Sequence, residues 1–187
     1  MDFKIKLEKL KEFPNTKLLI VITLLGCISY FFMTFVVFAP IELDLKGRTG
    51  YGVFEFELAW TSENVNKIFN AWGQDGKNKQ LLMTIIDFLY IPAYVAFIAG
   101  CLLLVTRNIE GKAQEIGLYM TLTPVFSGIF DVIENVNLIL MLIDDMFVWS
   151  ICPFMASLCA TIKFVLLFIA IISFILGLIV LIVQKLK

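Results

Sequence analysis

The chain contains no histidine and only four cysteines among its 187 residues. Without histidine it lacks the commonest zinc and copper ligand and the general base of Ser-His and Cys-His nucleophile pairs. The cysteines lie within or beside apolar runs, where a thiol usually packs as a small hydrophobic group, so they predict no disulfide framework. The composition therefore argues against a zinc enzyme, a triad hydrolase and a disulfide-rich domain.

Charge is also scarce. Charged residues make up 17% of the chain and the net charge is −1, so no basic surface points to nucleic acid. Hydrophobic residues make up 60%, 18 residues are phenylalanine and the mean hydropathy is +0.91, well above a soluble domain. The charges gather at the two ends and in one loop. We therefore predict an all-α membrane protein, a single domain over residues 1–187 built as a four-transmembrane-helix bundle.

The predicted spans are residues 18–39, 81–105, 116–143 and 152–183. Each reaches the roughly 20 residues that a hydrocarbon core requires. Residues 1–17 are basic and amphipathic, which suits either a helix on an anionic membrane surface or a solvated tail. The first apolar run is longer than that of a signal peptide, so we expect it to be retained.

Residues 40–80 form the one substantial predicted loop, and we place it outside the membrane. Apolar and polar residues alternate at 41–46 and again at 54–60, which predicts an extramembrane β-hairpin. Thr61 or Ser62 then caps a helix that Gly73 ends. The aromatic face of this region is expected to pack on the end of the bundle or in the headgroup layer. The alternative is that residues 53–73 bind a protein partner.

Basic residues indicate the orientation. They occur in residues 1–17, in the 106–115 loop and at the C-terminus, whereas the 143–152 loop carries Asp144 and Asp145 and no base. The 40–80 loop carries five bases and six acids, and a loop of this length has less influence on orientation. We expect the three basic segments to lie together. The positive-inside rule then places both termini in the cytoplasm of a multi-pass cell-membrane protein.

The third span contains Asp131, Glu134 and Asn135, which share one helix face because they are spaced i, i+3 and i+4. An ionisable residue at such depth normally faces the bundle interior and has a partner. The second span contributes Asp87 and the fourth contributes Lys163. At a rise of about 1.5 Å per residue, the four charged residues fall in the outer half of the membrane.

This polar layer has two physical interpretations. In one, Lys163 neutralises Asp131 or Glu134 and the other carboxyl groups are protonated, giving a closed structural network. In the other, the layer lines an acidic pocket that receives a cation, a proton or a lipid headgroup. The polar residues that can complete the hydrogen bonding in either case are Tyr90, Tyr94, Ser127 and Asn135. The chain shows no metal-binding motif, no nucleophile motif and no cofactor motif.

Two short segments and one dipeptide resemble sequences of a known family. DFLYIPAY at residues 87–94, DVIEN at residues 131–135 and the W-G pair at residues 72–73 resemble segments of a family of small bacterial four-span membrane proteins. The likeness covers most of the chain from the first span onward. It implies four spans and an aromatic-rich first outer loop, and it implies no activity. The layout is also similar in topology to four-helix sterol-isomerase-like proteins, which line a lipid cavity with acidic residues, although their isomerase members contain histidine.

Three functions fit these observations. The first is a membrane protein whose acidic pocket, with Asp131 and Glu134 as counter-charges, binds or passes a cationic or amphipathic small molecule, a lipid or an ion. The second is a lipid-modifying enzyme in which one carboxyl group acts as general acid and another as base. The third is an accessory subunit of a membrane complex, in which the polar layer only joins helices.

Overall fold

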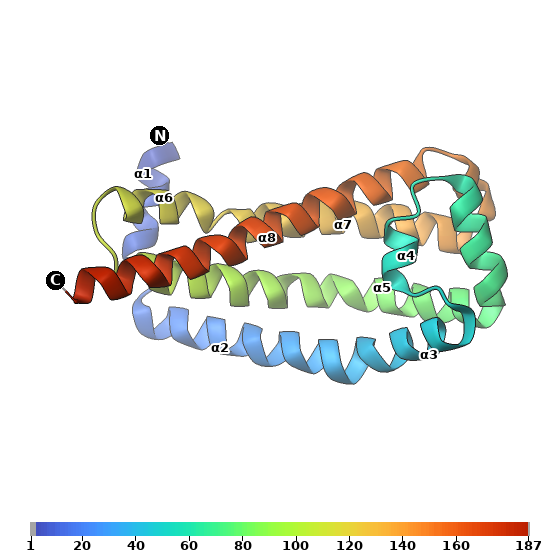
Figure 1. Ribbon diagram of the computed structural model, residues 1–187, viewed down its shortest axis with the longest axis horizontal. Helices are drawn as coiled ribbons and strands as arrows, with labels where there is room; N and C mark the ends of the chain where they lie inside the picture. Colours follow the sequence, from blue (N-terminus) through green and yellow to red (C-terminus); the bar gives the residue numbers. More distant parts are fainter. Residues whose placement is uncertain (1–2, 187) are drawn as a thin grey trace. The chain divides into compact units, whose positions relative to one another are not determined.

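The computed structural model describes residues 3–186, and these residues form helices joined by short connections, with no β-strand among them (Figure 1). Within this described part, four helical stretches are long and apolar enough to cross a membrane: Thr16–Thr49, Ser62–Thr106, Lys112–Ile143 and Cys152–Lys185. The predicted all-α class with four long apolar helices is confirmed.

The elements follow one another along the chain in this order: α1 (Phe3–Glu8), the 3₁₀ turn η1 (Lys9–Lys11), α2 (Thr16–Phe32), the π-helical segment η2 (Met33–Phe38), α3 (Ala39–Thr49), α4 (Val53–Glu57), α5 (Ser62–Thr106), α6 (Lys112–Met120), α7 (Thr123–Ile143), the 3₁₀ turn η3 (Asp145–Trp149) and α8 (Cys152–Lys185). They divide into two compact units. Unit 1 comprises residues 3–30, 92–128 and 164–186, and unit 2 comprises Phe31–Ile91 and Ile129–Lys163.

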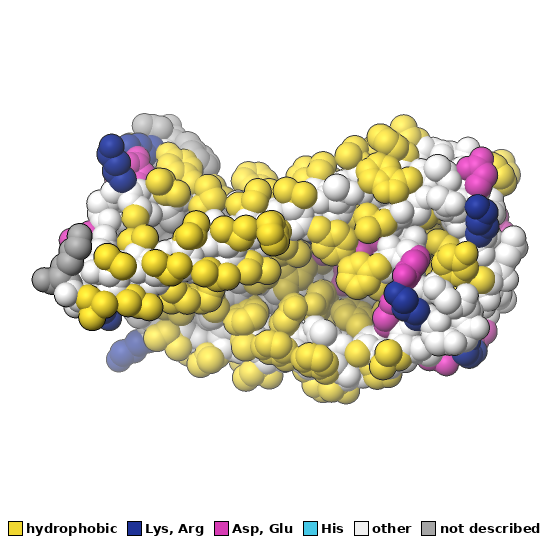
Figure 2. Space-filling view, viewed as in Figure 1, with side chains coloured by type: hydrophobic (Ala, Val, Ile, Leu, Met, Phe, Trp, Pro, Cys, Tyr) yellow, Lys and Arg dark blue, Asp and Glu magenta, His cyan; other side chains and the backbone are white. Residues whose placement is uncertain are grey.

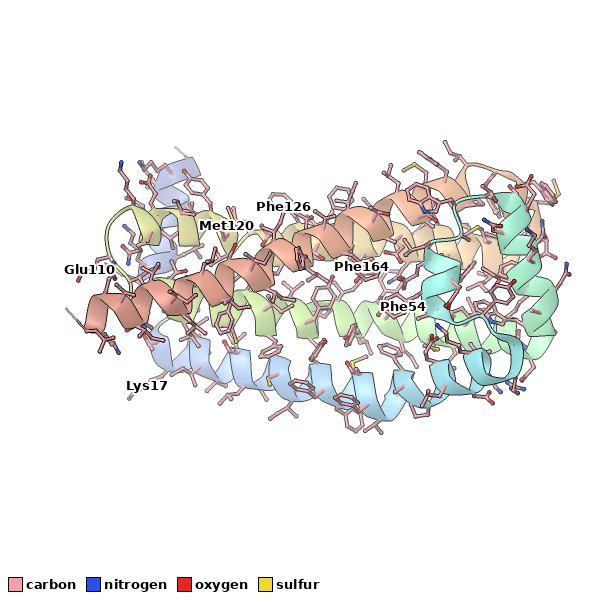
Figure 3. All side chains as sticks on the ribbon, viewed as in Figure 1. Lys17, Phe54, Glu110, Met120, Phe126 and Phe164 are labelled. Carbon is pink, nitrogen blue, oxygen red and sulfur yellow. The ribbon has the colours of Figure 1, made fainter. Side chains whose placement is uncertain are left out.

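Unit 1 brings the two ends of the chain together. A small buried core joins α1 to α2, α5 and α6 and consists of Leu7, Leu19, Leu103 and Leu118. Arg107 Nε donates to Leu10 O at 2.9 Å, and Gln184 exchanges hydrogen bonds with the backbone of Glu110 on the turn before α6 (Figure 3). The prediction that the basic N-terminal segment, the 106–115 loop and the C-terminal segment lie together is confirmed.

Glycine allows α2 to approach α5 closely in unit 1. A Cβ atom placed on Gly26 would lie 2.8 Å from both Ala93 O and Phe97 N, closer than packed atoms tolerate. One placed on Gly100 would collide with the Thr23 side chain. Gly100 is therefore a helix-contact residue, as its place in an apolar run predicts.

The third apolar stretch is broken just before Pro124. A proline inside a helix removes one backbone donor and clashes with the preceding turn, so α6 ends at Met120 and α7 begins at Thr123. The threonine hydroxyls satisfy carbonyl groups at the break, since Thr121 Oγ1 donates to Leu118 O and Thr123 Oγ1 donates to Met120 O. The second apolar stretch instead remains helical through Pro92.

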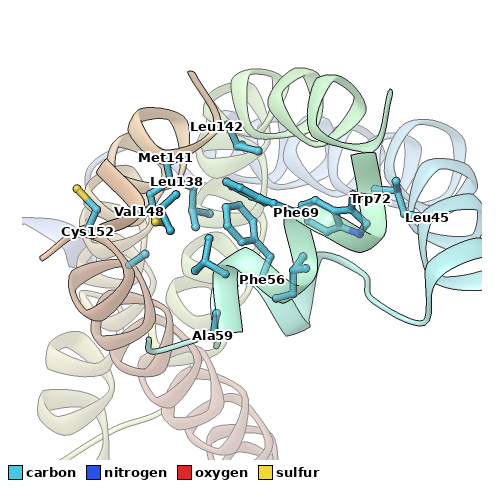
Figure 4. Close-up of a cluster of buried hydrophobic side chains, with 13 residues drawn as sticks. Leu45, Phe56, Ala59, Phe69, Trp72, Leu138, Met141, Leu142, Val148 and Cys152 are labelled. Carbon is cyan, nitrogen blue, oxygen red and sulfur yellow. The ribbon is translucent and has the colours of Figure 1, made fainter. Parts of the chain in front are cut away.

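Unit 2 has a larger core of buried apolar side chains at one end of its helices (Figure 4). Aromatic residues from α4 and α5 dominate it, with the Phe56 ring 5.4 Å from Phe69 and 5.3 Å from Trp72 between centroids. They pack against Leu138 and Met141 of α7. The expectation that the aromatic face of residues 53–73 packs on the end of the bundle is confirmed.

The predicted β-hairpin is wrong, because both segments are helical. Helix α3 buries Leu45 while Leu43, two residues earlier, is 73% exposed. Helix α4 buries Phe56 and leaves Phe54 pointing outward (Figure 3). Residues two apart lie about 200° apart around a helix, so an alternating pattern of this short length fits one buried helical position as well as it fits a strand.

The connections between these helices have identifiable local causes. Gly50 ends α3 in the left-handed region with φ 79°, and its N–H donates to Lys46 O. Thr61 Oγ1 accepts from Asn64 N, so Thr61 caps α5 as predicted. Gly73 interrupts α5 with a non-helical φ of 60° and ψ of −170°, at the position where the sequence predicts a helix end.

Candidate functional site

Helix α7 carries its polar residues on the buried face. Asp131, Glu134 and Asn135 are 3%, 0% and 3% exposed, whereas Val132 and Val136 are 39% and 47% exposed. A soluble helix shows the opposite distribution, with apolar residues inside. This pattern is typical of a helix that presents apolar side chains to lipid and polar side chains to the protein interior.

The other helices expose apolar surface as well. In the most apolar window of the Cys152–Lys185 stretch, 6% of residues are buried, against 44% for the Lys112–Ile143 stretch. Figure 2 shows hydrophobic side chains covering the outward side of α8 within unit 1. An apolar surface of this extent on a soluble protein would promote association, and in a bilayer it meets lipid tails.

Four charged side chains from three helices meet in unit 2, and we call them the Lys163 cluster. Lys163 Nζ lies 2.8 Å from Glu134 Oε2, 3.1 Å from Asp131 Oδ1 and 3.6 Å from Glu57 Oε2. All four side chains are 12% exposed or less. The expectation that Lys163 pairs with the carboxyl groups of the third span therefore agrees with this geometry.

The helical spacing explains how the cluster assembles. Asp131 and Glu134 are one turn apart on the buried face of α7, so both carboxyl groups reach one ammonium on α8. The third carboxyl group comes from the last residue of α4. Near it, Trp60 N donates to Ser157 Oγ of α8 at 2.9 Å, which fixes the connection after α4 against α8.

Glu57 is the cluster member that sequence reasoning missed. In a strand, Glu55 and Glu57 would share one polar face, and the alternating pattern places both in solvent. In the helix they diverge: Glu55 pairs with Lys46 at 2.6 Å on the surface, while Glu57 faces Lys163. The local pattern gave no signal of this difference, because only the packing of α4 against α8 creates it.

Asp87 and Asn135 form a second polar contact in unit 2. Asn135 Nδ2 donates to Asp87 Oδ2 at 2.6 Å, which joins α7 to α5. Tyr90, one turn after Asp87, lies with its hydroxyl oxygen 3.1 Å from Thr34 Oγ1 in the π-helical segment, and its ring meets Phe38 edge to face. Helices α5 and α7 thus bring Asp87 to Asn135, and the π-helical segment η2 adds a hydroxyl group beside Tyr90.

Tyr94 and Ser127 are the predicted site residues that fall in unit 1 rather than unit 2. Both are buried, at 3% and 0% exposed. All charged residues of the predicted site therefore lie within unit 2. Glu57, which was not predicted, lies there too.

The electrostatics of the Lys163 cluster are unbalanced, because three carboxyl groups face one ammonium. Glu134 Oε1 is buried and has no hydrogen-bond partner among the described residues. Glu134 Oε2 lies 2.8 Å from Lys163 Nζ and forms an ion pair with it. Burial raises the pKa of Glu57, and the Asp131 charge adds to this effect, although Lys163 opposes it. The arrangement can therefore accept a proton or another cation.

The fold and this site define the class as a helical protein with four potential membrane-spanning stretches and a buried charged cluster in unit 2. No protein-family model, curated protein or solved structure matches the chain. The resemblance of residues 87–94 and 131–135 to a bacterial four-span family stays a prediction.

Proposed function

We propose that the protein is a multi-pass cell-membrane protein, with both termini cytoplasmic, whose Lys163 cluster reversibly binds a cation. The proton is the ligand that the geometry favours. The observation that supports the proposal is the excess of buried carboxyl groups over ammonium groups at one point in unit 2.

The charge balance supports cation binding. If all three carboxyl groups were ionised, the cluster would carry two uncompensated negative charges in a buried position. Two unit charges about 4 Å apart at an effective dielectric constant of 20 repel by about 4 kcal/mol, so neutralising one of them is strongly favourable. A purely structural ion pair requires only one carboxyl group, whereas three carboxyl groups share the ammonium of Lys163 here.

The packing favours a small ligand over a bulky one. The ammonium of Lys163 touches its carboxyl partners directly, at 2.8 Å and 3.1 Å for the α7 residues. Among the residues that the structure describes, no three His, Cys, Asp or Glu side chains are placed to bind a metal ion together. A proton requires no space and no coordination shell, and it converts one carboxyl group into a donor for a neighbouring carboxylate of the cluster.

The test is proton binding by the purified protein in lipid nanodiscs, followed by the infrared absorption of protonated carboxyl groups as the pH is changed. We expect a titrating carboxyl signal in the parent protein that is lost in the variant Asp131→Asn with Glu134→Gln. Glu55→Gln is the matched control, because Glu55 is two residues from Glu57 but faces Lys46 on the surface. A signal that is identical in the double variant would contradict the proposal.

A second arm distinguishes the proton from other cations. The same titration is repeated in sodium, potassium and a bulky organic cation at equal ionic strength. If the proton is the ligand, the carboxyl signal does not depend on which cation is present. A signal displaced by one of these cations would show that the cluster binds that cation in competition with the proton.

A further inference from the structure

A groove in unit 1 lies between the N-terminal helix and the start of the third long apolar stretch. It encloses about 270 Å³, close to the lower limit of about 300 Å³ for small-molecule sites. One wall is a single face of α1 and η1, and the other is a single face of α6 and the residue before it. Its lining residues are Lys4, Leu7, Glu8, Lys11, Gly111, Gln114, Glu115, Leu118 and Tyr119.

The groove carries both signs of charge. Lys4 Nζ lies 2.9 Å from Glu115 Oε1 across the groove, and Lys11 Nζ lies 4.0 Å from Glu8 Oε1. These side chains are between 40% and 57% exposed. Exposed ion pairs contribute little to stability, so a ligand with its own charges can replace them at small cost. A zwitterion supplies one charge for each sign.

The groove is also lined by apolar side chains, of which Leu7 and Leu118 are buried at 5% and 2% exposed. A ligand with a charged head and an apolar tail matches this combination. The groove also adjoins the beginnings of the Thr16–Thr49 and Lys112–Ile143 stretches, which is the level of lipid headgroups if these stretches span a bilayer.

We propose that this groove binds the headgroup of a phospholipid that carries both a phosphate and a primary amine. The phosphate accepts hydrogen bonds from Lys4 and Lys11, and the amine donates to Glu8 and Glu115. The site is separate from the Lys163 cluster, since all of its lining residues belong to unit 1. It therefore does not depend on the proposed proton binding.

The experiment uses the full chain purified in detergent and short-chain lipids as probes. Phosphatidylethanolamine, phosphatidylcholine and phosphatidylglycerol are offered at equal concentration, and bound lipid is counted by native mass spectrometry. We expect phosphatidylethanolamine to be retained preferentially, because only it combines the phosphate with a primary amine. Equal retention of all three lipids would overturn the proposal.

Variants locate the binding. Lys11→Gln combined with Glu8→Gln removes one charge of each sign and is expected to weaken phosphatidylethanolamine binding about a hundredfold, as for the loss of two charge-assisted hydrogen bonds. Lys9→Gln is the matched control, because Lys9 is an exposed neighbour that does not line the groove. Unchanged affinity in the double variant would overturn the site. Equal affinity for free phosphoethanolamine and for the lipid would also overturn the proposal, because the ligand would then be a soluble molecule.

Discussion

Lys163 is the residue on which the charged cluster depends. Its Nζ lies within 4 Å of a carboxyl oxygen of Asp131, Glu134 and Glu57. Removing one partner of a buried ion pair is far more costly than replacing the whole pair by apolar groups, because the remaining charge stays buried and unpaired. The cluster should therefore respond asymmetrically to substitution.

We expect Lys163→Met to lower the free energy of unfolding by about 3 kcal/mol, because it leaves the buried carboxyl groups without a counter-charge. Adding Asp131→Asn and Glu134→Gln to this variant should restore much of the loss. Denaturant-induced unfolding in detergent micelles measures both changes. Lys79→Met, which removes a cation from an exposed pair with Asp44 and Asp75, serves as control and should change little. A loss that the added substitutions do not restore would show that the charge balance is not the cause.

Glu57 predicts a dependence of stability on pH. Burial raises its pKa above the ordinary value of 4.5, so the folded protein binds this proton more tightly than the unfolded chain does. Stability from this group is therefore complete below pH 4.5 and is lost as the pH rises toward the raised value. We expect Glu57→Gln to flatten the fall of the unfolding free energy between acidic and alkaline pH, measured by thermal unfolding across that range. Glu55→Gln should leave that fall in place, because Glu55 has its own surface partner in Lys46.

At the scale of elements, the helix contacts within unit 1 differ in kind from those within unit 2. In unit 1, α2 and α5 approach through glycine, and in unit 2 the short helix α4 inserts an aromatic ring into the core. Each kind of contact can be tested by comparing a buried residue with an exposed residue of the same type.

Gly26→Ala should destabilise the protein by about 1–3 kcal/mol, because the added methyl group meets backbone atoms of α5 that cannot rotate away. Gly47→Ala is the matched control. Gly47 lies in the exposed part of α3, where nothing surrounds an added Cβ within 4 Å, so the higher helix propensity of alanine should stabilise by about 0.5–1 kcal/mol. The test is the shift in melting temperature of each variant in the same detergent. Equal shifts for the two variants would be inconsistent with close α2–α5 contact.

Phe56→Ala should cost about 3–5 kcal/mol, since Phe56 is 1% exposed and its ring contacts both Phe69 and Trp72. Phe54→Ala, two residues earlier and 54% exposed, should cost less than about 1 kcal/mol. Equilibrium unfolding of both variants tests the helical conformation of α4 directly. In the strand that the alternating pattern predicts, the two phenylalanines would share one face and their costs would be similar.

At the scale of the whole molecule, the proposed topology places the ends of the chain together. The contacts of Arg107 with Leu10 and of Gln184 with Glu110 show that the N-terminal segment, the 106–112 turn and the end of α8 are neighbours in unit 1. An even number of membrane spans would also bring both ends of the chain to one side of the membrane. Our proposal that this side is the cytoplasm rests on the basic residues of these segments.

Epitope tags test this topology in intact cells. Tags at either terminus should be inaccessible to an antibody until the membrane is permeabilised, and a tag inserted between Asp144 and Asp145 should be accessible from outside. Permeabilised cells provide the control for expression of each tagged chain. Accessibility of one terminus and not the other would contradict a four-span arrangement, and accessibility of both would reverse the orientation.

Much of the fold could be predicted from the sequence. Apolar runs of sufficient length predict four long helices, and the i, i+3, i+4 spacing of Asp131, Glu134 and Asn135 predicts the buried face of α7, because helical geometry alone places these side chains together. The scarcity of charge and the excess of phenylalanine predict apolar outer surfaces. These properties are local or compositional, and no partner segment has to be known to read them.

Only the tertiary structure decided which segments meet. The conformation of residues 41–60 depends on whether Leu45 and Phe56 find a core, and that core is supplied by residues about 80 positions later in α7, such as Leu138 and Met141. The same packing brings Glu57 to Lys163 and converts a two-helix ion pair into a three-helix cluster with surplus acid. The sequence by itself determined which polar side chains of α7 are buried, since periodicity is a property of one helix. The composition of the site depended on contacts between helices, and these are a property of the folded chain.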